Sequence, residues 1–352
     1  MDSYLDSNTN KAIALQAELK GSEVKPNGDF LDITYKEKTL SINATTGAIK
    51  QPLPVITAGQ KAPATSNAQY KSGNYTAVIP AGFKVSNQPG ESSIETGLVI
   101  KDDAGNEFVW IPVGIPRKSD SSKTIELSRY TFGSNGKPTN QDSNSYFEEE
   151  PRETGTNNAV AKNINEFISK TNVAGGFWIG RYEARTTSST ARSSSSDPLT
   201  AVTEKPEYSV YNYIKQTDAS AKAIAMYDEN DYFQSDLINS YAWDTATLFL
   251  QEYDNRTGSN FTKYSWQNSI NKGSLLATGT VSETNKDKIC NVYDMASNCY
   301  EWTTETYSDS YAPCVIRGGY YNGSGDYTSR RNYDTTANAY GGNSFRPVLY
   351  VK

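Results

Sequence analysis

Residues 1–56 combine a helical pattern with an alternating one. Residues 4–20 place apolar side chains at the spacing of a weakly amphipathic helix, and residues 29–49 alternate apolar and polar positions with a period of two. The alternation predicts two or three short strands, with turns at residues 36–38 and 46–47. We therefore expect a small module over residues 1–56, a helix followed by an antiparallel sheet.

A linker and a larger domain are expected after this module. Residues 57–75 are rich in Ala, Ser, Gly, Pro and Asn, a composition typical of linkers. The larger domain is assigned to residues 76–352. Residues 117–145 and 186–200 are rich in Ser, Thr and Asn, and we expect them to form surface loops of this domain.

The larger domain shows two helical patterns among many short strands. Within residues 160–168 apolar side chains fall at i, i+4, i+7 and i+8, on one face of a helix. A glycine pair at 175–176 follows this helix, and residues 177–184 are expected to form a strand. Residues 242–253 show a second apolar helical face. Helices mixed with short strands and long loops predict an α+β fold.

Composition excludes several kinds of chemistry. The chain has 352 residues, 36% of them hydrophobic, and a net charge of −6. Its basic residues are outnumbered and do not cluster, so nucleic acid is not an expected partner. The sequence has no histidine, which rules out Ser-His-Asp and Cys-His nucleophiles and metal sites that need imidazole. Tyrosine is abundant, with 25 copies, and its apolar ring with a polar tip suits binding surfaces.

The three cysteines are Cys290, Cys299 and Cys314. Their odd and small number does not describe a disulfide scaffold. One disulfide with one free thiol, or three buried thiols, are both open at this point. We expect none of the three to have a functional role.

Six short motifs follow one another along the larger domain. They lie at Phe108–Val113, Phe177–Glu183, Trp243 with Ala246, Asn291–Trp302, Arg317–Tyr320 and Ser344–Val348. The second is similar to F-x-I-G-x-Y-E, the fourth to G-L-Y-D-M-x-G-N-V-x-E-W, the fifth to R-G-G and the last to G-F-R. In this order they resemble the formylglycine-generating-enzyme-like branch of the C-type lectin fold, which implies that fold for the larger domain.

The fourth motif contains a candidate site for a hard cation. Asp294, Asn298 and Glu301 bring carboxylate and amide oxygens close together in the chain, and these are the ligands that Ca²⁺ prefers. Relatives in the resembled family carry calcium near this segment. Ser297 stands where the family has glycine, which changes the expected backbone geometry. The alternative is a turn whose side chains satisfy buried backbone groups.

The catalytic branches of the resembled family are not matched residue by residue. Formylglycine-generating enzymes use a cysteine pair after the R-G-G element, and sulfoxide synthases need histidine ligands, but this chain has no cysteine after Arg317 and no histidine. Cys314 precedes the element, and Cys299 is expected to lie in the core. The calcium-dependent sugar motifs of lectins are also missing. Arg317 and Arg346 are expected to bridge buried carbonyls and carboxylates.

A tyrosine-rich segment extends from Tyr307 to Asn343. Its tyrosines are interleaved with Gly, Ser, Asn, Asp and Arg, and large aliphatic side chains nearly vanish. Such a segment contributes little to a core. Rigid tyrosines, small polar residues and arginine are the composition of antibody binding surfaces. Residues 320–344 are flanked by two stretches that resemble core segments, Val315–Gly319 and Phe345–Val351.

This arrangement resembles the variable proteins of diversity-generating retroelements, which use the same fold. Their C-terminal segment is mutated mostly at asparagine codons, so the resemblance implies a variable ligand-binding segment at about residues 307–344. The alternative is a set of tyrosine-rich loops that close the domain. The implied ligand-contacting positions are Tyr320, Tyr321, Gly323, Asp326, Tyr327, Arg331, Tyr333, Asp334, Tyr340 and Gly341.

We therefore expect a non-catalytic ligand-binding protein of receptor or adhesin type, whose partner is an unknown protein or surface ligand. Residues 1–56 resemble the globular part of a type IV pilin-like protein, which implies pilus-like assembly at a bacterial cell surface or outside the cell, in a bacterial or phage-encoded protein. The sequence has no signal peptide and no span of about 18 apolar residues, so membrane contact is expected only through a removed N-terminal segment. No cofactor is required, and Ca²⁺ is the candidate ion. The alternatives are a formylglycine-generating-type oxygen-dependent enzyme and a structural pilus component.

Overall fold

Contacts divide the chain into two units, Met1–Pro54 and Val55–Lys352. The sequence places the end of the small module at residue 56. This structure is a computed structural model. It describes residues 23–27, 30–35, 38–45, 49–50, 53–133, 137–140, 145–148, 163–187, 192–197, 199–205, 209–228, 230–254, 273–280, 287–323 and 327–352.

The N-terminal unit contains an antiparallel sheet in the order β1-β2-β3-β4. The alternating pattern of residues 29–49 forms strands as predicted, and Val24 and Leu31 are buried together. Tyr35 pairs with Lys38 at the predicted turn. The helix predicted for residues 4–20 lies outside the described residues. The strands are β1 (Glu23–Asn27), β2 (Phe30–Tyr35), β3 (Lys38–Asn43) and β4 (Ile49–Lys50).

Residues 57–75 belong to the larger unit and do not form the predicted linker. Ala62 and Tyr70 are buried in a core cluster that also contains Trp110 and Trp178. The composition misleads here because small side chains suit closely packed strands as well as linkers. The segment contributes to a three-stranded sheet of β5 (Val55–Ile56), β6 (Ala68–Ser72) and β7 (Tyr75–Ile79).

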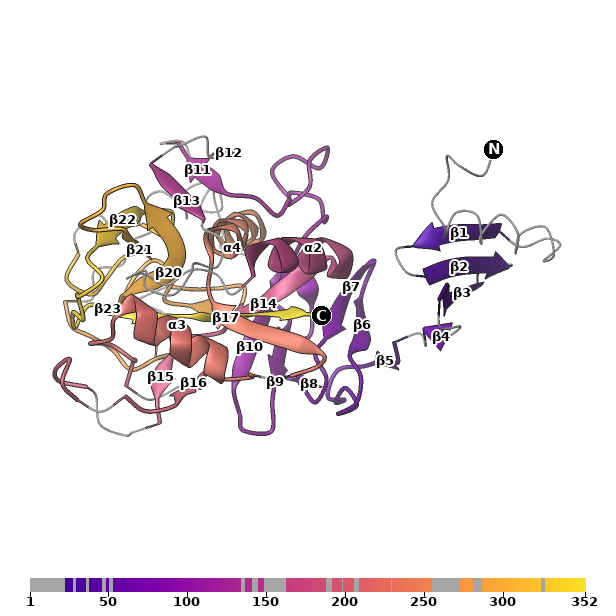
Figure 1. Ribbon diagram of the computed structural model, residues 1–352, viewed down its shortest axis with the longest axis horizontal. Helices are drawn as coiled ribbons and strands as arrows, with labels where there is room; N and C mark the ends of the chain where they lie inside the picture. Colours follow the sequence, from indigo (N-terminus) through magenta and orange to yellow (C-terminus); the bar gives the residue numbers. More distant parts are fainter. Residues whose placement is uncertain are drawn as a thin grey trace. The chain divides into compact units, whose positions relative to one another are not determined.

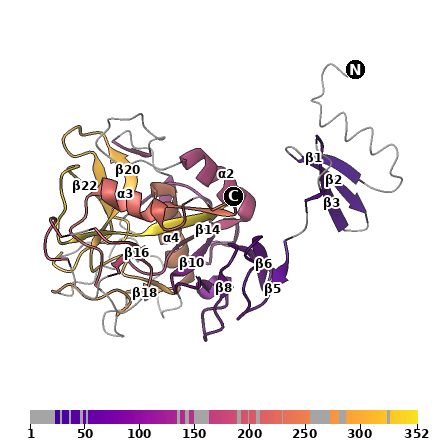
Figure 2. The same ribbon diagram turned by 60° about the horizontal axis from the view of Figure 1, so that its bottom comes forward.

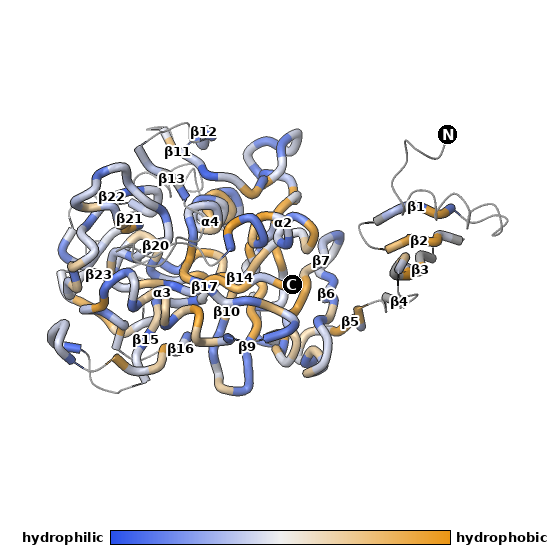
Figure 3. Tube along the Cα trace, viewed as in Figure 1, coloured by the Kyte–Doolittle hydropathy of each residue, from blue (hydrophilic) through white to orange (hydrophobic). Residues whose placement is uncertain are grey.

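A six-stranded sheet forms the centre of the larger unit, in the order β17-β24-β14-β10-β9-β8. Figure 3 shows that hydrophobic residues concentrate around this sheet. Trp110 and Trp178 are direct cross-strand partners, with ring centroids 4.9 Å apart. The C-terminal strand lies between two others, so the end of the chain completes the sheet. The strands are β8 (Lys84–Val85), β9 (Val99–Lys101), β10 (Glu107–Pro112), β14 (Gly176–Gly180), β17 (Phe233–Leu237) and β24 (Pro347–Val351).

Helices α2 (Ile164–Ala174) and α4 (Ser240–Tyr253) confirm the two helical patterns in the sequence. Asn163 and Asn239 cap them by accepting hydrogen bonds from backbone N–H groups in the first turn. A further helix, α3 (Gln216–Ala225), was not predicted. Its buried apolar residues are alanines, so its sequence shows a weak apolar face.

The tyrosine-rich segment contributes strands to a second sheet. Its strand order is β13-β20-β21-β22, and β23 pairs with β20 in parallel. Figures 1 and 2 agree in placing this sheet on the opposite side of the larger unit from β5 and β8. The strands are β13 (Tyr146–Glu148), β20 (Tyr300–Tyr307), β21 (Cys314–Arg317), β22 (Arg331–Asp334) and β23 (Asn343–Phe345).

Short elements complete the described part of the chain. Few helices and many strands give an α+β fold, as predicted. No helix among the described residues is long and apolar enough to cross a membrane. The short elements are η2 (Ile94–Thr96), β11 (Tyr130–Phe132), β12 (Pro138–Asn140), β15 (Arg185–Thr186), β16 (Val202–Thr203), β18 (Lys288–Ile289) and β19 (Val292–Tyr293).

Candidate functional site

Tyrosines from separate parts of the chain meet around the ends of β21 and β23. The rings of Tyr300 and Tyr320 stack with centroids 4.6 Å apart. Tyr320 also meets Tyr321 and Tyr340 edge-on, at 5.6 Å and 6.5 Å. Tyr213 joins them, because its backbone N–H donates to the carbonyl of Tyr340 at 3.2 Å. We call these five residues the tyrosine cluster.

A second aromatic group stands on the sheet of β13, β20 and β22. Tyr146 pairs with Tyr307 across neighbouring strands, and their ring centroids are 4.7 Å apart. Tyr307 stacks in turn on Tyr333 at 4.1 Å. Tyr333 is 42% exposed, so the end of the stack is open to solvent. We call these three residues the tyrosine row.

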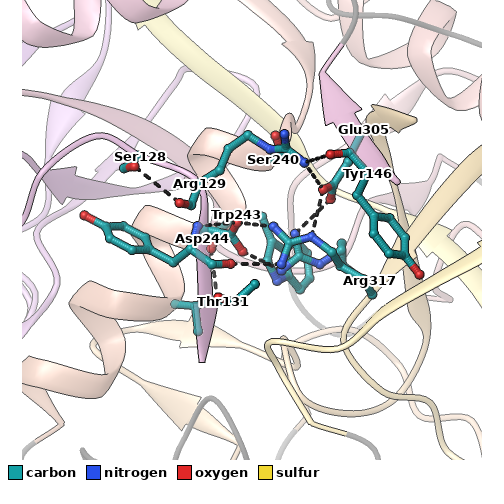
Figure 4. Close-up of polar contacts among 12 residues, drawn as sticks. Ser128, Arg129, Thr131, Tyr146, Ser240, Trp243, Asp244, Glu305 and Arg317 are labelled. Carbon is teal, nitrogen blue, oxygen red and sulfur yellow. Dashed lines mark hydrogen bonds and ion pairs between the residues drawn. The ribbon is translucent and has the colours of Figure 1, made fainter. Parts of the chain in front are cut away.

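A buried ion network lies beside the tyrosine row, and Figure 4 shows most of its members. Arg317 binds Asp244 at 2.5 Å and Glu305 at 3.1 Å. Arg331 binds the same two carboxylates, with a 2.7 Å contact to Glu305. Arg129 binds Glu305 at 2.7 Å. The network joins α4 to the second sheet, since Asp244 lies on α4 and Glu305 on β20.

The arginines determine the charge state of this network. Burial raises the pKa of Glu305, but Arg331, Arg317 and Arg129 outweigh burial and lower the pKa to about 2. Glu305 is therefore ionised at neutral pH. Arg129 also donates to the carbonyl of Tyr146 at 2.8 Å, so the network holds one end of the tyrosine row in place.

The structure corrects the expectation for Arg331, which the sequence places among the ligand contacts. Its side chain is only 8% exposed. It donates to Glu305, to Asp244 and to the carbonyl of Tyr130. These buried charge-assisted hydrogen bonds hold the guanidinium of Arg331 in the interior of the protein.

Other expected ligand contacts also have structural surroundings. Gly323 and Gly341 are buried, and a Cβ added to Gly341 would lie 2.7 Å from the Tyr213 ring. These two glycines therefore support the loops and offer no side chain to a ligand. The half-buried Asp334 accepts hydrogen bonds from the N–H of Thr335 and from Asn338 and Asn343. Asp326 lies outside the described residues.

The tyrosines among the expected ligand contacts all reach the surface at least in part. Tyr340 is 47% exposed and Tyr333 42% exposed. Tyr320, Tyr321 and Tyr327 are half-buried. The structure thus brings four of these five positions into the tyrosine cluster and the tyrosine row, and their contact with a ligand stays a prediction.

The predicted cation site has the geometry of its alternative, a turn that satisfies buried groups. Glu301 uses both carboxylate oxygens to bind Arg346, at 2.7 Å and 3.0 Å. The amide oxygen of Asn298 accepts from the N–H of Leu276 at 2.9 Å. Asp294 is buried and has a left-handed backbone, with φ of 64°. Among the described residues no group of three or more Cys, Asp or Glu side chains is arranged to hold a metal ion.

Predictions for several buried residues are confirmed. Arg346 donates to the carbonyls of Gly180 and Tyr293 as well as to Glu301. Arg317 bridges carboxylates and the carbonyl of Arg330. The three cysteines form no disulfide with one another, which removes the alternative with a disulfide. Cys299 lies in the core, as expected.

Sequence analysis missed the residues that lie far from the C-terminal segment. Tyr146 and Tyr213 sit in short segments with no regular pattern, so no local signal marks them. Asp244 lies inside the W-x-x-A motif and Glu305 shortly after the fourth motif. Neither of these two motifs contains arginine, so pairing the carboxylates with Arg317 and Arg331 requires the fold.

Comparisons with known proteins found no matching family model and no matching curated protein. Among solved structures, the chain is similar to PvdO from Pseudomonas aeruginosa, with 12% identity, a TM-score of 0.37, and coverage of 75% of this chain and 100% of the other. It is similar to the Major Tropism Determinant P3c variant, with 13% identity, a TM-score of 0.31, and coverage of 93% and 83%. It is also similar to Treponema denticola variable protein 1, with 13% identity, a TM-score of 0.25, and coverage of 81% and 99%. These TM-scores are all below 0.5, so the interpretation of the site rests on this chain's own residues.

Proposed function

We propose that this chain is a non-catalytic ligand-binding protein of receptor or adhesin type. The observation that carries the proposal is that surface tyrosines stand next to a buried ion network. The tyrosine cluster and the tyrosine row are built from strands and loops, and the buried ion network fixes the strands beneath the row. Rigid tyrosine rings provide contact area at low entropic cost, which suits a binding surface.

We propose a C-type lectin-like fold of the formylglycine-generating-enzyme type for the larger unit. The motif strands support it, because β10, β14 and β24 are neighbours in one sheet although they lie far apart in the chain. The fifth motif begins at Arg317, the last residue of β21. Arg317 binds Asp244, which follows Trp243 in the third motif. The motifs that carry the resemblance therefore meet in space.

The absence of catalysis is part of the proposal. The sequence has no histidine and no cysteine after Arg317. Cys299 and Cys314 are buried, and a thiol without access to substrate does not suit an oxygen-activating pair. No observation favours the enzymatic alternative.

The proposed partner is a protein or another ligand on a cell surface, and the proposed location is the cell surface or the extracellular space. The N-terminal unit would serve as an attachment piece. This role is compatible with the larger unit, because the second sheet lies on the opposite side of that unit from its first strand, β5 (Figures 1 and 2).

A binding screen with a triple variant tests the proposal. We expect Tyr321→Ala, Tyr327→Ala and Tyr340→Ala together to abolish capture of the partner found by screening host-surface and bacterial-surface proteins. Tyr311→Ala is the matched control, because Tyr311 is 80% exposed and lies outside the tyrosine cluster and the tyrosine row. If the triple variant binds as well as the wild type, the structural pilus component becomes the better account.

A further inference from the structure

Tyr213 has an unusual backbone for its residue type. Its φ is 51°, in the left-handed region that L side chains rarely adopt. Two contacts to the tyrosine-rich segment accompany this conformation: the N–H of Tyr213 donates to the carbonyl of Tyr340, and the Asn212 amide donates to the carbonyl of Gly341 at 2.9 Å. Backbone strain of this kind often marks functional surfaces.

The glycine pair Gly341-Gly342 lets the rings of the tyrosine cluster converge. A Cβ on Gly341 would lie 2.7 Å from Tyr213, and a Cβ on Gly342 would lie 2.8 Å from Tyr340 and 3.0 Å from Tyr320. The bare backbone of the two glycines therefore leaves room for the rings of Tyr213, Tyr320 and Tyr340. The sequence does not reveal this arrangement, because Tyr213 precedes α3 and lies far along the chain from Tyr320 and Tyr340.

The rings of the tyrosine cluster present faces in several directions. Tyr320 meets Tyr321 at 69° and Tyr340 at 64° between ring planes. Tyr340 is 47% exposed. One ring already holds a cation, since the Arg330 guanidinium lies 5.5 Å from the ring centroid of Tyr300. The electron-rich faces of tyrosine attract cations in this geometry.

The charge of the whole chain and one buried oxygen of Asn212, the neighbour of Tyr213, also favour a cation. The chain carries a net charge of −6, which attracts basic partners over distance. The amide oxygen Oδ1 of Asn212 is buried and has no hydrogen-bond partner in the described part of the chain. The amide nitrogen of the same Asn212 side chain donates to the Gly341 carbonyl, and the Tyr213 ring lies close to Gly341.

We propose that the tyrosine cluster seats an arginine side chain of a protein partner, and that Tyr213 is a ligand-contacting residue outside the C-terminal segment. This inference rests on the proposed binding function and adds the chemistry of the ligand. The guanidinium would lie over the rings of Tyr340 and Tyr213, as that of Arg330 lies over Tyr300.

Short peptides test the chemistry directly. The probe is a blocked pentapeptide with two arginines, and its partner has citrulline at both positions, which keeps the shape and removes the charge. We expect titration of the full chain, followed by NMR, to give roughly 3- to 30-fold weaker binding for the citrulline peptide. Tyr340→Leu and Tyr213→Leu should weaken arginine binding by a similar factor, while Tyr213→Phe should retain it.

The leucine variants separate ring recognition from general attraction, because they leave the net charge unchanged. Tyr311→Leu should bind the arginine peptide like the wild type. Tyr340→Leu keeps the test valid if Tyr213→Leu does not fold, since the Tyr340 side chain is 47% exposed. Absent binding of the arginine peptide, equal binding of both peptides, or full binding by Tyr340→Leu would each overturn the inference. In those cases the triple alanine variant still decides the proposed function independently.

Discussion

Arg331 lies in the middle of the tyrosine-rich segment, but its guanidinium serves the interior. It shares Asp244 and Glu305 with Arg317. A neutral residue at this position would leave two buried carboxylates with fewer partners, and such losses are costly. Composition alone suggests a binding role for Arg331. Its contacts instead make it part of the buried ion network.

We predict that Arg331→Met lowers the free energy of unfolding by about 3 kcal/mol. Methionine keeps much of the side-chain volume, so the loss reports the ion pairs and hydrogen bonds. Urea unfolding followed by tryptophan fluorescence measures it. Tyr311→Ser is the control and should change stability by less than about 0.5 kcal/mol. An unchanged free energy of unfolding for Arg331→Met would show that these contacts of the buried ion network do not stabilise the fold.

We predict that Gly341→Ala costs about 1 kcal/mol, because its Cβ meets the Tyr213 ring. In a Tyr213→Ala background the same substitution should cost much less. A double-mutant cycle measures this coupling. Additive effects would show that the ring does not constrain the glycine.

At the scale of elements, the short strand β13 completes the tyrosine row. Its Glu148 accepts hydrogen bonds from the N–H and hydroxyl of Ser240, at the start of α4, and from the hydroxyl of Thr304. Burial raises the pKa of Glu148 to about 7, and the neighbouring charge of Glu305 also raises it. The Glu148 carboxyl thus links β13 to α4 and to β20, and its charge changes near neutral pH.

These contacts of Glu148 predict that the stability of the protein depends on pH. Glu148 binds its proton more tightly in the folded state, with a pKa of about 7 against an ordinary value of 4.5. Its contribution to stability is therefore fully present below pH 4.5 and is lost as the pH rises through about 7. We expect Glu148→Gln to reduce the loss of stability between about pH 5 and about pH 8 by about 2 to 3 kcal/mol.

Urea unfolding at both pH values, with amide exchange of residues 145–148, measures the effect. Glu183 and Glu204 are shifted in the same direction by burial, so the variant must be compared with the wild type at each pH. An identical pH dependence in both proteins would contradict the role of Glu148.

Several elements could be predicted from the sequence because their patterns are local. Apolar periodicity predicts α2 and α4, and alternation predicts β2 and β3. Helix α3 escapes because alanine gives little contrast between faces. The tyrosine row and the ion network escape for a different reason: they join β13, α4 and β20–β22, and pairing across such distances depends on tertiary packing.

At the scale of the whole molecule, the two units differ in the buried clusters that their described residues form. In the N-terminal unit the buried apolar cluster contains Val24 and Leu31, with Ile33 and Ala44 packed against it. The larger unit contains extensive clusters around both sheets.

We predict that removing residues 1–54 leaves the unfolding of the larger unit unchanged. All five tryptophans follow Val55, so tryptophan fluorescence reports that unit alone. The urea midpoint of the piece Val55–Lys352 should equal that of the full chain. A clearly lower midpoint would mean that the N-terminal unit supports the larger one.

We propose that the buried ion network holds a tyrosine-rich surface that varies between isolates. Sequencing this locus across related isolates tests it most directly. We expect substitutions to concentrate at the codons of surface tyrosines, such as Tyr321, Tyr333 and Tyr340, while Arg331 and Gly341 stay constant. If residues 307–344 vary no more than residues 90–300, the claim of a diversified binding surface is contradicted.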